Sequence, residues 1–410
     1  MNGNEPWTSG LCSDLVVLEL ASVLAGPSVG QFFAELGARV IKVENPLTGG
    51  DVTRTWKMPG ESDPDRSSYF FACNWGKESI AIDLKTSQGR DLMHRLVGIS
   101  DIVLSNYLPS ATQKLSADYE SLKLIKEDII LGSIVGYSPD SNRPGYDAII
   151  QAEAGYYYIN GEPKNPGWKP TKMPVPLMDI LAGHQLKQAL LMALLRKNMS
   201  GEGSHVTVSL FDAAVSALTN QSTCWLVAGH IPEPLGSEHP NIAPYGSVYD
   251  TLDGHSIVLG VGTDRQFHAL CELLGIEHLS HDQRFETNQN RVANRQDLRT
   301  ILQSSIKERN RAQLLKQCHS VKIPAGAVRK MNEVFEITPD HLTLKSPDGV
   351  ARGVRESAIW PENDLADMTR PPAYASSTMD ILSSDLELNA DEINDLLENS
   401  VVAADSRTIA

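Results

Sequence analysis

The stretch LVVLELASVLAGPSVGQFFAELGARVIKVE, residues 15–44, contains the pattern that decides the fold. Its first six residues form a short apolar run that predicts a strand, and the remainder predicts a turn, a helix and a second strand. Pro27 suits the first turn of that helix, and Gly37 suits the position just after its last residue. The stretch therefore predicts a strand–helix–strand unit.

The same alternation continues along the chain. Apolar runs predict strands over residues 79–84, 101–106 and 128–137, and residues 87–98 predict a helix between the first two of these strands. Strands that alternate with helices indicate a largely parallel sheet covered by helices. We therefore expect an α/β fold with a large Rossmann-like domain.

The character of the sequence changes in the second half of the chain. A loop rich in Pro, Gly and His leads there into a predicted hairpin that turns at Asp253 and Gly254. We expect a large domain over residues 1–229 and a smaller α+β domain over residues 230–325. The C-terminal segment, residues 326–410, is expected to return to the large domain.

Composition narrows the possible partners and cofactors. The chain of 410 residues has a formal net charge of -15 without long charged runs, which disfavours nucleic acid and anionic membranes as partners. No basic segment precedes an apolar core at the N-terminus, and no apolar window is long enough to span a membrane, so we expect a cytoplasmic protein. Five cysteines lie far apart without a CxxC pair, which argues against a disulfide framework and a metal site. These are Cys12, Cys73, Cys224, Cys271 and Cys318.

The first predicted turn invites a comparison with dinucleotide-binding proteins. Glu44 ends the second strand 18 residues after Gly26, roughly where an acid would bind a ribose. However, LAGPSVG lacks the G-x-G-x-x-G spacing, and Pro27 falls within the turn. The motif therefore disfavours a nicotinamide cofactor. Lys42 and Glu44 at the end of this strand are consistent with a surface ion pair of little energetic value.

Motifs in order along most of the chain carry a resemblance to a known family. They are LASVLAGPSVGQFFAELGARVIKVENPLTGGDVTR, NWGKESIAIDLKTSQGR, SNYLP, GYDAIIQAEAG, MDILAG, VTVSLFDAA, LGVGTDRQF and VKIPAGAV. Together they resemble the class III CoA-transferases, the CaiB/BaiF family of formyl-CoA and carnitine CoA-transferases, which also contains the α-methylacyl-CoA racemases. The resemblance implies a homodimer of two interlocked, ring-like chains.

One carboxylate has two possible roles. Asp179 immediately precedes a predicted helix, where an Asp commonly serves as the N-cap. The resemblance instead implies that Asp179 is the nucleophile, and the two roles are compatible. A helix N-terminus stabilises an ionised carboxylate, whereas an apolar setting opposes its charge.

The resemblance also implies a mechanism. Asp179 attacks an acyl-CoA thioester to give a mixed anhydride, CoA moves onto Asp179 as an enzyme thioester, and the incoming acid receives it through a second anhydride. Coenzyme A enters as the acyl-CoA substrate, and no metal or redox cofactor is required. The site must exclude water while anhydrides exist, and each tetrahedral step needs an oxyanion hole.

CoA contacts follow from the resemblance by position. Asn45 stands where some relatives carry Arg, and for Lys85 or Lys114 a solvated surface charge is an equally good interpretation. The positions implied to contact CoA are Ser22, Val23, Leu24, Ala25, Asn45, Ile82, Lys85, Asn106, Tyr107 and Lys114.

The position of Tyr146 separates two reactions. Racemases of this superfamily carry a histidine there, which moves an α-proton together with the aspartate. Tyrosine has an ordinary pKa near 10 and is a poor base, so the sequence favours transfer over racemisation. Two alternatives nevertheless stay open, an acyl-CoA isomerase and a non-catalytic CoA-binding relative.

The acids transferred are constrained by exclusion. The GGGGQ loop of formyl-CoA transferases is absent, and SEHPNIAPYGSVY in its place is more like relatives that handle dicarboxylates. Succinyl-CoA is a plausible donor by analogy. Substrate contacts are predicted at Tyr137, Tyr146, His239 and Tyr245, although the last two are equally compatible with ordinary loop residues.

Overall fold

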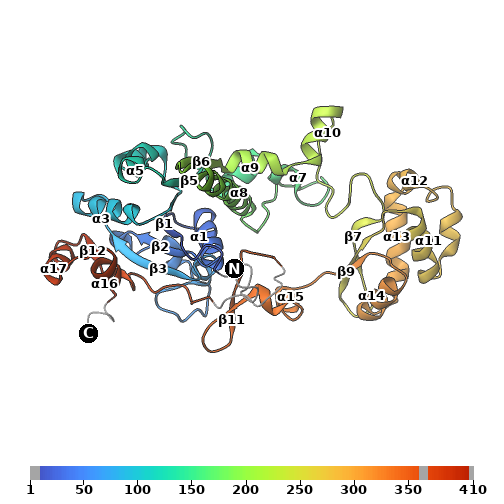
Figure 1. Cartoon of the computed structure of the whole chain (residues 1–410). Helices are drawn as coiled ribbons and strands as arrows, with labels where there is room; N and C mark the ends of the chain where they lie inside the picture. The colour runs from blue at the N-terminus through green and yellow to red at the C-terminus, as the bar shows by residue number, and fades with distance from the viewer. Residues whose placement is uncertain (1–9, 360–367, 406–410) are drawn as a thin grey trace. The chain divides into compact units, whose positions relative to one another are not determined.

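The computed structural model describes residues 10–359 and 368–405 (Figure 1). These residues form two compact units. The first comprises the described residues up to Ala154, Pro174–Thr223, and those from Pro339 onward. The second comprises Gly155–Met173 and Cys224–Thr338.

A mostly parallel sheet forms the centre of the first unit (Figure 1). Its seven described strands have the order β12-β3-β2-β1-β4-β5-β6. All neighbours pair in parallel except β12, which is antiparallel to β3. The strands are β1 Val16–Leu20, β2 Arg39–Glu44, β3 Lys77–Ile82, β4 Ile102–Ser105, β5 Ile130–Val135, β6 Ser204–Ser209 and β12 Val402–Ala403. The α/β prediction is therefore confirmed.

The first strand–helix–strand unit forms as predicted. Helix α1 spans Ala25–Glu35 and contains Pro27 in its first turn. Gly37 follows the C-cap residue Leu36 and has φ +94°, a conformation that glycine adopts without strain. Strand β3 begins two residues before its predicted start, and helix α3 spans Ser87–Gly98 as expected.

Two helical layers cover the sheet. On one face, α3 and the C-terminal helices pack against Leu18, Ile41 and Ile80 through residues that include Leu96 and Ile393. On the other face lie α1 and α8, with α8 also contacting β5 and β6. The C-terminal helices are α16 Thr378–Asp380, the π-helical turn Ile381–Asp385 and α17 Ala390–Glu398, and α8 is Leu177–Ser200.

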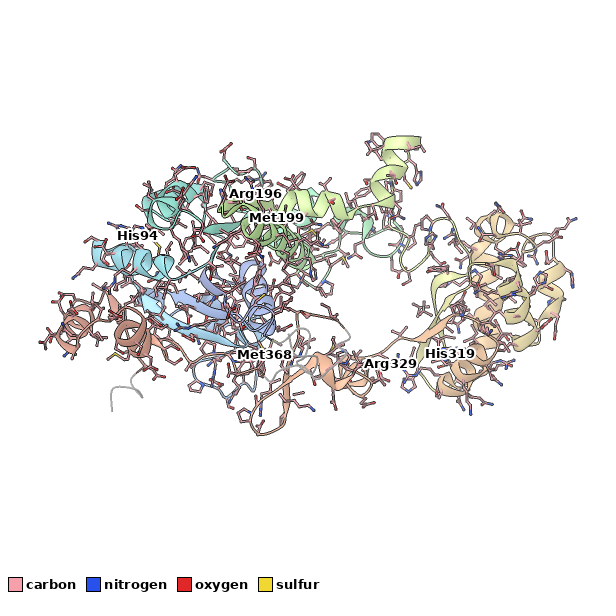
Figure 2. All side chains as sticks on the ribbon, viewed as in Figure 1. His94, Arg196, Met199, His319, Arg329 and Met368 are labelled. Atoms are coloured by element: carbon pink, nitrogen blue, oxygen red, sulfur yellow. The ribbon has the colours of Figure 1, made fainter. Side chains whose placement is uncertain are left out.

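The first unit also contains a small satellite cluster. Phe71, Trp75 and Leu344 pack together, and Met368, labelled in Figure 2, packs against them. The other elements of this unit are α2 Ser68–Phe71, α4 Pro109–Lys114, α5 Tyr119–Ile125, α6 Asp147–Glu153, α9 Leu210–Ala217, β10 Thr343–Lys345 and β11 Ala351–Val354. Helix α10, Asn220–Ala228, contains the boundary between the two units.

The second unit is a smaller α+β structure. Its three-stranded antiparallel sheet has the order β7-β8-β9, and the β7–β8 hairpin turns at Asp253 and Gly254 as predicted. His319, labelled in Figure 2, contacts the carbonyl of Ala325 at 3.0 Å and so joins α14 to β9. The elements are α7 Tyr156–Ile159, β7 Tyr245–Asp250, β8 Ser256–Gly260, α11 Asp264–Leu274, α12 Asn288–Ala293, α13 Arg295–Ile306, α14 Arg311–Ser320, β9 Ala325–Ala327 and α15 Met331–Phe335.

The second unit differs in extent from the predicted 230–325 domain. It includes residues 155–173, because this segment pairs with a distant part of the chain. The amide of Gly236 donates to the carbonyl of Gly161 at 2.8 Å, and Lys164 forms an ion pair with Glu233 at 2.5 Å. Local sequence patterns do not reveal such pairings. Within the described ranges, no helix has both the length and the apolar character that a bilayer crossing requires.

Candidate active site

Asp179 lies in the first turn of α8, as its third helical residue, and is half-buried. The prediction that it serves as the N-cap is wrong, because Pro176 occupies that position. Asp147 performs the capping instead: its Oδ1 accepts a hydrogen bond from the amide of Met178 at 2.8 Å. Asp147 is buried, and Gln151 Nε2 donates to its Oδ2 at 2.8 Å. Sequence analysis missed this role because the two partners lie 31 residues apart.

Close packing of α8 on α1 brings Asp179 near the predicted CoA-binding turn. A Cβ placed on Gly183 would lie 2.6 Å from Ser28 Oγ and 3.3 Å from the carbonyl oxygen of Ala25. Residues four apart share a face of a helix, so Asp179 is on the face of α8 that meets α1. The nucleophile candidate and the first turn of α1 are therefore neighbours.

The turn between β1 and α1 has an unusual backbone. Val23 has φ +72°, a left-handed conformation that is rare for a β-branched residue. The side chain of Asn106, just after β4, accepts from the amide of Ser22 at 3.1 Å and donates to its carbonyl at 2.7 Å. The amide of Val23 donates to Asp51 Oδ2 at 3.2 Å. Two segments from distant parts of the sequence therefore hold this turn.

A buried charge network lies beneath the turn. Lys42 Nζ is 2.9 Å from Glu19 Oε1 and 3.0 Å from Asp51 Oδ2, and it donates to the carbonyl of Ala21 at 2.8 Å. Lys77 Nζ binds the other oxygen of Glu19 at 2.7 Å. The side chain of Lys42 is 1% exposed, so its interpretation as part of a surface ion pair is wrong.

The charges in this network shift one another's protonation. Burial opposes ionisation of Asp51, but the charge of Lys42 and hydrogen bonds from Thr53 outweigh it and lower the pKa of Asp51 to about 2. Burial likewise opposes the charge of Lys42, but Glu19 and Asp51 outweigh it and raise the pKa of Lys42. Both groups are therefore ionised at neutral pH.

Glu44 is also buried and belongs to a separate bidentate pair. Arg54 binds its two oxygens, with Nη2 to Oε1 at 2.6 Å and Nε to Oε2 at 2.8 Å. Burial opposes its charge, but Arg54 outweighs burial and lowers the pKa of Glu44. The interpretation of Glu44 as part of a surface ion pair is wrong as well. Its carboxylate instead holds the loop after β2, because its Oε2 also accepts a hydrogen bond from the amide of Asp51 at 2.8 Å.

Tyr69 in α2 is a candidate site residue that sequence analysis missed. Burial, followed by the negative charge of Asp179, raises its pKa to about 12. The phenol of Tyr69 is therefore protonated at neutral pH and can act as a hydrogen-bond donor. A single tyrosine between two loops carries no local signal that marks it as functional.

Several predicted CoA positions follow the carboxyl ends of parallel strands. Asn45 comes after β2, Lys85 after β3 and Asn106 after β4, which places them at one edge of the sheet. Lys85 and Lys114 are exposed, whereas Tyr107 is half-buried against the core. Asn45 Oδ1 accepts from the amide of Leu47 at 2.9 Å. The side chain of Ile82 lies in the core, 1% exposed.

The predicted substrate residues fall in both units. Tyr146 is 70% exposed and occupies the N-cap position of α6, next to Asp147. Tyr137 donates to Glu153 at 2.7 Å, and Arg143 stacks over its ring. In the second unit, His239 and Tyr245 contact each other with ring centroids 5.3 Å apart. Among the described residues, no group of three or more His, Cys, Asp or Glu side chains could hold a metal ion.

Comparison with known proteins adds a family context to this geometry. A model of CoA-transferase family III matches residues 12–348. A succinate–glutarate CoA-transferase from Agrobacterium fabrum is 38% identical and covers 89% of this chain and 90% of that protein. An acetyl-CoA:oxalate CoA-transferase from Acetobacter aceti is 33% identical, and the match covers 79% of this chain and 82% of that protein. The crystal structure of a CaiB/BaiF family protein from Brucella suis is 38% identical and superposes with a TM-score of 0.80. The superposition covers 93% of this chain and 100% of that protein's chain.

Proposed function

The chain belongs to CoA-transferase family III and is a transferase, and from this premise we propose that it moves CoA from succinyl-CoA to a small carboxylic or dicarboxylic acid with Asp179 as nucleophile. The resemblance seen in the sequence is thereby confirmed. The observation that carries the proposal is the placement of Asp179 in the first turn of α8, packed through Gly183 against the first turn of α1.

The relatives support dicarboxylic acids as substrates. The names of the two enzymes compared above give succinate, glutarate and oxalate, all of which carry two carboxylates. By analogy we propose succinyl-CoA as donor and a short dicarboxylate as acceptor. Tyr137, Tyr146, His239 and Tyr245 remain our proposed substrate contacts.

The proposed reaction proceeds through acyl exchange on one carboxylate. Asp179 attacks the thioester carbonyl, the C–S bond breaks, and a mixed anhydride and a CoA thiolate form. The thiolate attacks the Asp179 carbonyl, which releases the donor acid and leaves an enzyme thioester. The acceptor carboxylate then displaces the thiolate to form a second anhydride. Finally the thiolate attacks the acceptor's acyl carbon, which gives the new acyl-CoA and regenerates Asp179.

The local electrostatics suit this sequence of steps. The positive end of the α8 dipole stabilises the carboxylate of Asp179 before attack. Tyr69, whose pKa is raised to about 12, stays protonated at neutral pH, and we propose it as a donor to an oxyanion that develops beside Asp179. Amides in the first turn of α1, which lack intrahelical acceptors, are further candidate donors.

Racemisation remains the main alternative. It requires a base at the position of Tyr146, which is a highly exposed tyrosine here. An isomerase would exchange the substrate's α-proton with solvent deuterium, and a transferase would not. A non-catalytic CoA-binding relative would bind CoA equally well after Asp179→Ala.

The remaining family expectations are proposals of the same kind. We propose contact with CoA at Ser22–Ala25, Asn45, Ile82, Lys85, Asn106, Tyr107 and Lys114. We also propose an interlocked homodimer, a cytoplasmic location and a reaction without a metal or redox cofactor. Size-exclusion chromatography at nanomolar concentration tests the dimer, because interlocked chains should not separate on dilution.

One experiment tests the central proposal. The protein is incubated with succinyl-CoA and a pool of mono- and dicarboxylic acids, and every acyl-CoA is followed by mass spectrometry. The matched control is Asp212→Asn, because Asp212 is also the third residue of its helix, α9, but is exposed. Asp179→Asn and Asp179→Ala should abolish new acyl-CoA, whereas Asp212→Asn should retain it.

Trapping adds direct evidence for the covalent step. Hydroxylamine should leave an aspartyl hydroxamate on the peptide that contains Asp179 only when acyl-CoA is present. Full transfer activity in Asp179→Ala would show that another group is the nucleophile.

A further inference from the structure

The backbone of the predicted CoA-binding turn is held in a conformation that its own sequence disfavours. Val23 has φ +72°, although its branched Cβ makes left-handed backbone costly. Such a conformation persists only when surrounding contacts impose it. Contacts around Ala21–Leu24 must therefore hold Val23 in this conformation.

Lys42 and Asp51 contact the two peptide groups that precede the Cα of Val23. Lys42 Nζ donates to the carbonyl of Ala21 at 2.8 Å, and Asp51 Oδ2 accepts from the amide of Val23 at 3.2 Å. The two side chains are joined by their own ion pair at 3.0 Å, and each is 1% exposed. The Lys42–Asp51 ion pair therefore forms hydrogen bonds with two successive peptide groups of the turn, those that join Ala21 to Ser22 and Ser22 to Val23.

Further hydrogen bonds restrict the backbone of the turn. The side chain of Asn106 binds both the main-chain amide and the carbonyl of Ser22, and the thiol of Cys73 donates to the carbonyl of Val23 at 3.5 Å. Asp51 is itself fixed by Thr53, whose amide and hydroxyl donate to its Oδ1 at 3.0 and 2.8 Å. These hydrogen bonds fix the side chain of Asp51 and, with it, the position of the Lys42–Asp51 ion pair beneath the turn.

We propose that Lys42 and Asp51 are positioning residues that hold the turn between β1 and α1 in its left-handed form for the acyl-CoA substrate. This inference rests on the proposed function, because it assumes that the turn meets CoA. Neither side chain touches the substrate, since both are buried beneath the turn.

The retention of charge here supports positioning over simple stabilisation. A buried ion pair gains little over apolar residues of similar volume, because desolvation offsets the attraction. An ion pair with additional hydrogen bonds to main-chain groups, however, specifies one backbone geometry, which apolar packing cannot do. Lys77 offers the contrast: it pairs with the same Glu19 but binds the carbonyl of Pro27, inside α1, at 2.9 Å.

Steady-state kinetics of Lys42→Met and Lys77→Met test the proposal. Both variants remove one buried lysine from Glu19, but only Lys42→Met releases the turn. We expect Lys42→Met to raise KM for acyl-CoA by about tenfold, with kcat per active site and KM for the acceptor acid changed by less than about threefold. Lys77→Met should leave KM for acyl-CoA unchanged. Equal values of this KM in the two variants would overturn the proposal.

A rescue variant separates positioning from damage to the fold. Glycine adopts positive φ without strain, so Val23→Gly in the Lys42→Met background should recover part of the lost affinity for acyl-CoA. A purely structural defect would not respond to this change. If Lys42→Met does not fold, Asp51→Asn replaces it, with Glu35→Gln as control, because Glu35 is a buried carboxylate that accepts the amides of Glu356 and Ser357. Asp51→Asn must then raise KM for acyl-CoA, and an unchanged value contradicts the proposal.

Calorimetric titration with CoA distinguishes failure of this inference from failure of the proposed function. If the unmutated protein transfers CoA but Lys42→Met and Lys77→Met bind CoA with equal affinity, the positioning role is refuted and the transfer reaction is not. CoA binding weakened only in Lys42→Met, without transfer by the unmutated protein, would support the inference and refute the transfer reaction. Absence of CoA binding by the unmutated protein would refute both.

Discussion

Replacing Gly183 with alanine should separate α8 from α1 and displace Asp179 from its neighbours. The added Cβ would lie 2.6 Å from Ser28 Oγ, about 0.8 Å short of the 3.4 Å at which ordinary contact begins. Ser28 cannot easily move away, because it is buried and its hydroxyl donates to the carbonyl of Ala25 at 3.0 Å. Relief of the clash therefore costs either this buried hydrogen bond or a shift of the two helices.

The expected magnitude combines two opposing terms. Overpacking of this kind costs about 1–3 kcal/mol, whereas alanine in a helix gains about 1 kcal/mol over glycine. We expect Gly183→Ala to be destabilised by about 1 kcal/mol, which lowers Tm by about 2–4 °C in a domain of this size. If the shift reaches Asp179, kcat should fall by about tenfold or more.

Removal of the opposing atom should reverse the effect. Ser28→Ala alone loses a buried hydrogen bond worth about 1 kcal/mol. In the double variant the clash with Oγ is gone, and the next contact, at 3.3 Å to the Ala25 carbonyl, is far milder. The double variant should therefore be more stable than the two single changes would add up to, by about 1–2 kcal/mol.

Calorimetry and kcat measurements on the four proteins check this cycle. Gly98→Ala is the control, because a Cβ there meets nothing within 4 Å. Strict additivity in Tm, with kcat of Gly183→Ala unchanged, would refute the contact as the element that sets the position of Asp179.

Three further predictions concern other contacts of the first unit and the cysteines. Asp147→Ala should cost about 1–2 kcal/mol and lower kcat, because the amide of Met178 loses its cap, while Asp147→Asn should cost less; calorimetry and kcat compare them. The pKa of Asp51 is lowered from 3.8 to about 2, so its contribution of about 2 kcal/mol is complete above about pH 4 and is lost as pH falls toward 2. The stability gap between the unmutated protein and Asp51→Asn, measured by urea unfolding, should therefore narrow below pH 4. Iodoacetamide should label half-buried Cys224 first in the native protein, because burial shields the other thiols and raises their pKa; peptide mass spectrometry would contradict this if they reacted equally fast.

The regular part of the fold was predictable because its signals are local. The apolar run of β1, the helical spacing of α1 and the glycine at position 37 each act within a few residues. Alternation of strand and helix then leaves few sheet topologies, which is why the parallel sheet followed from sequence. Asp179 could be singled out by motif, although its role as a cap could not be decided.

The burial of charge was not predictable in the same way. In β2 the polar side chains Lys42 and Glu44 alternate with Ile41 and Val43, a pattern that usually marks a solvent-facing side. Both are buried because opposite charges arrive from other segments, such as Arg54. The capping of Met178 by Asp147 and the pairing of residues 155–173 in the second unit are nonlocal for the same reason.

The core of the first unit has a consequence for how the protein is made. Leu18 and Ile41 pack in one cluster with Ile381 and Ile393, and the whole second unit lies between these segments in the chain. During synthesis the N-terminal strands and α3 therefore emerge long before the C-terminal helices that complete the cover of this sheet face. We expect the nascent chain to hold an apolar sheet face that α3 covers only in part while the second unit completes its own core, which makes folding of the first unit slow and dependent on protection from aggregation.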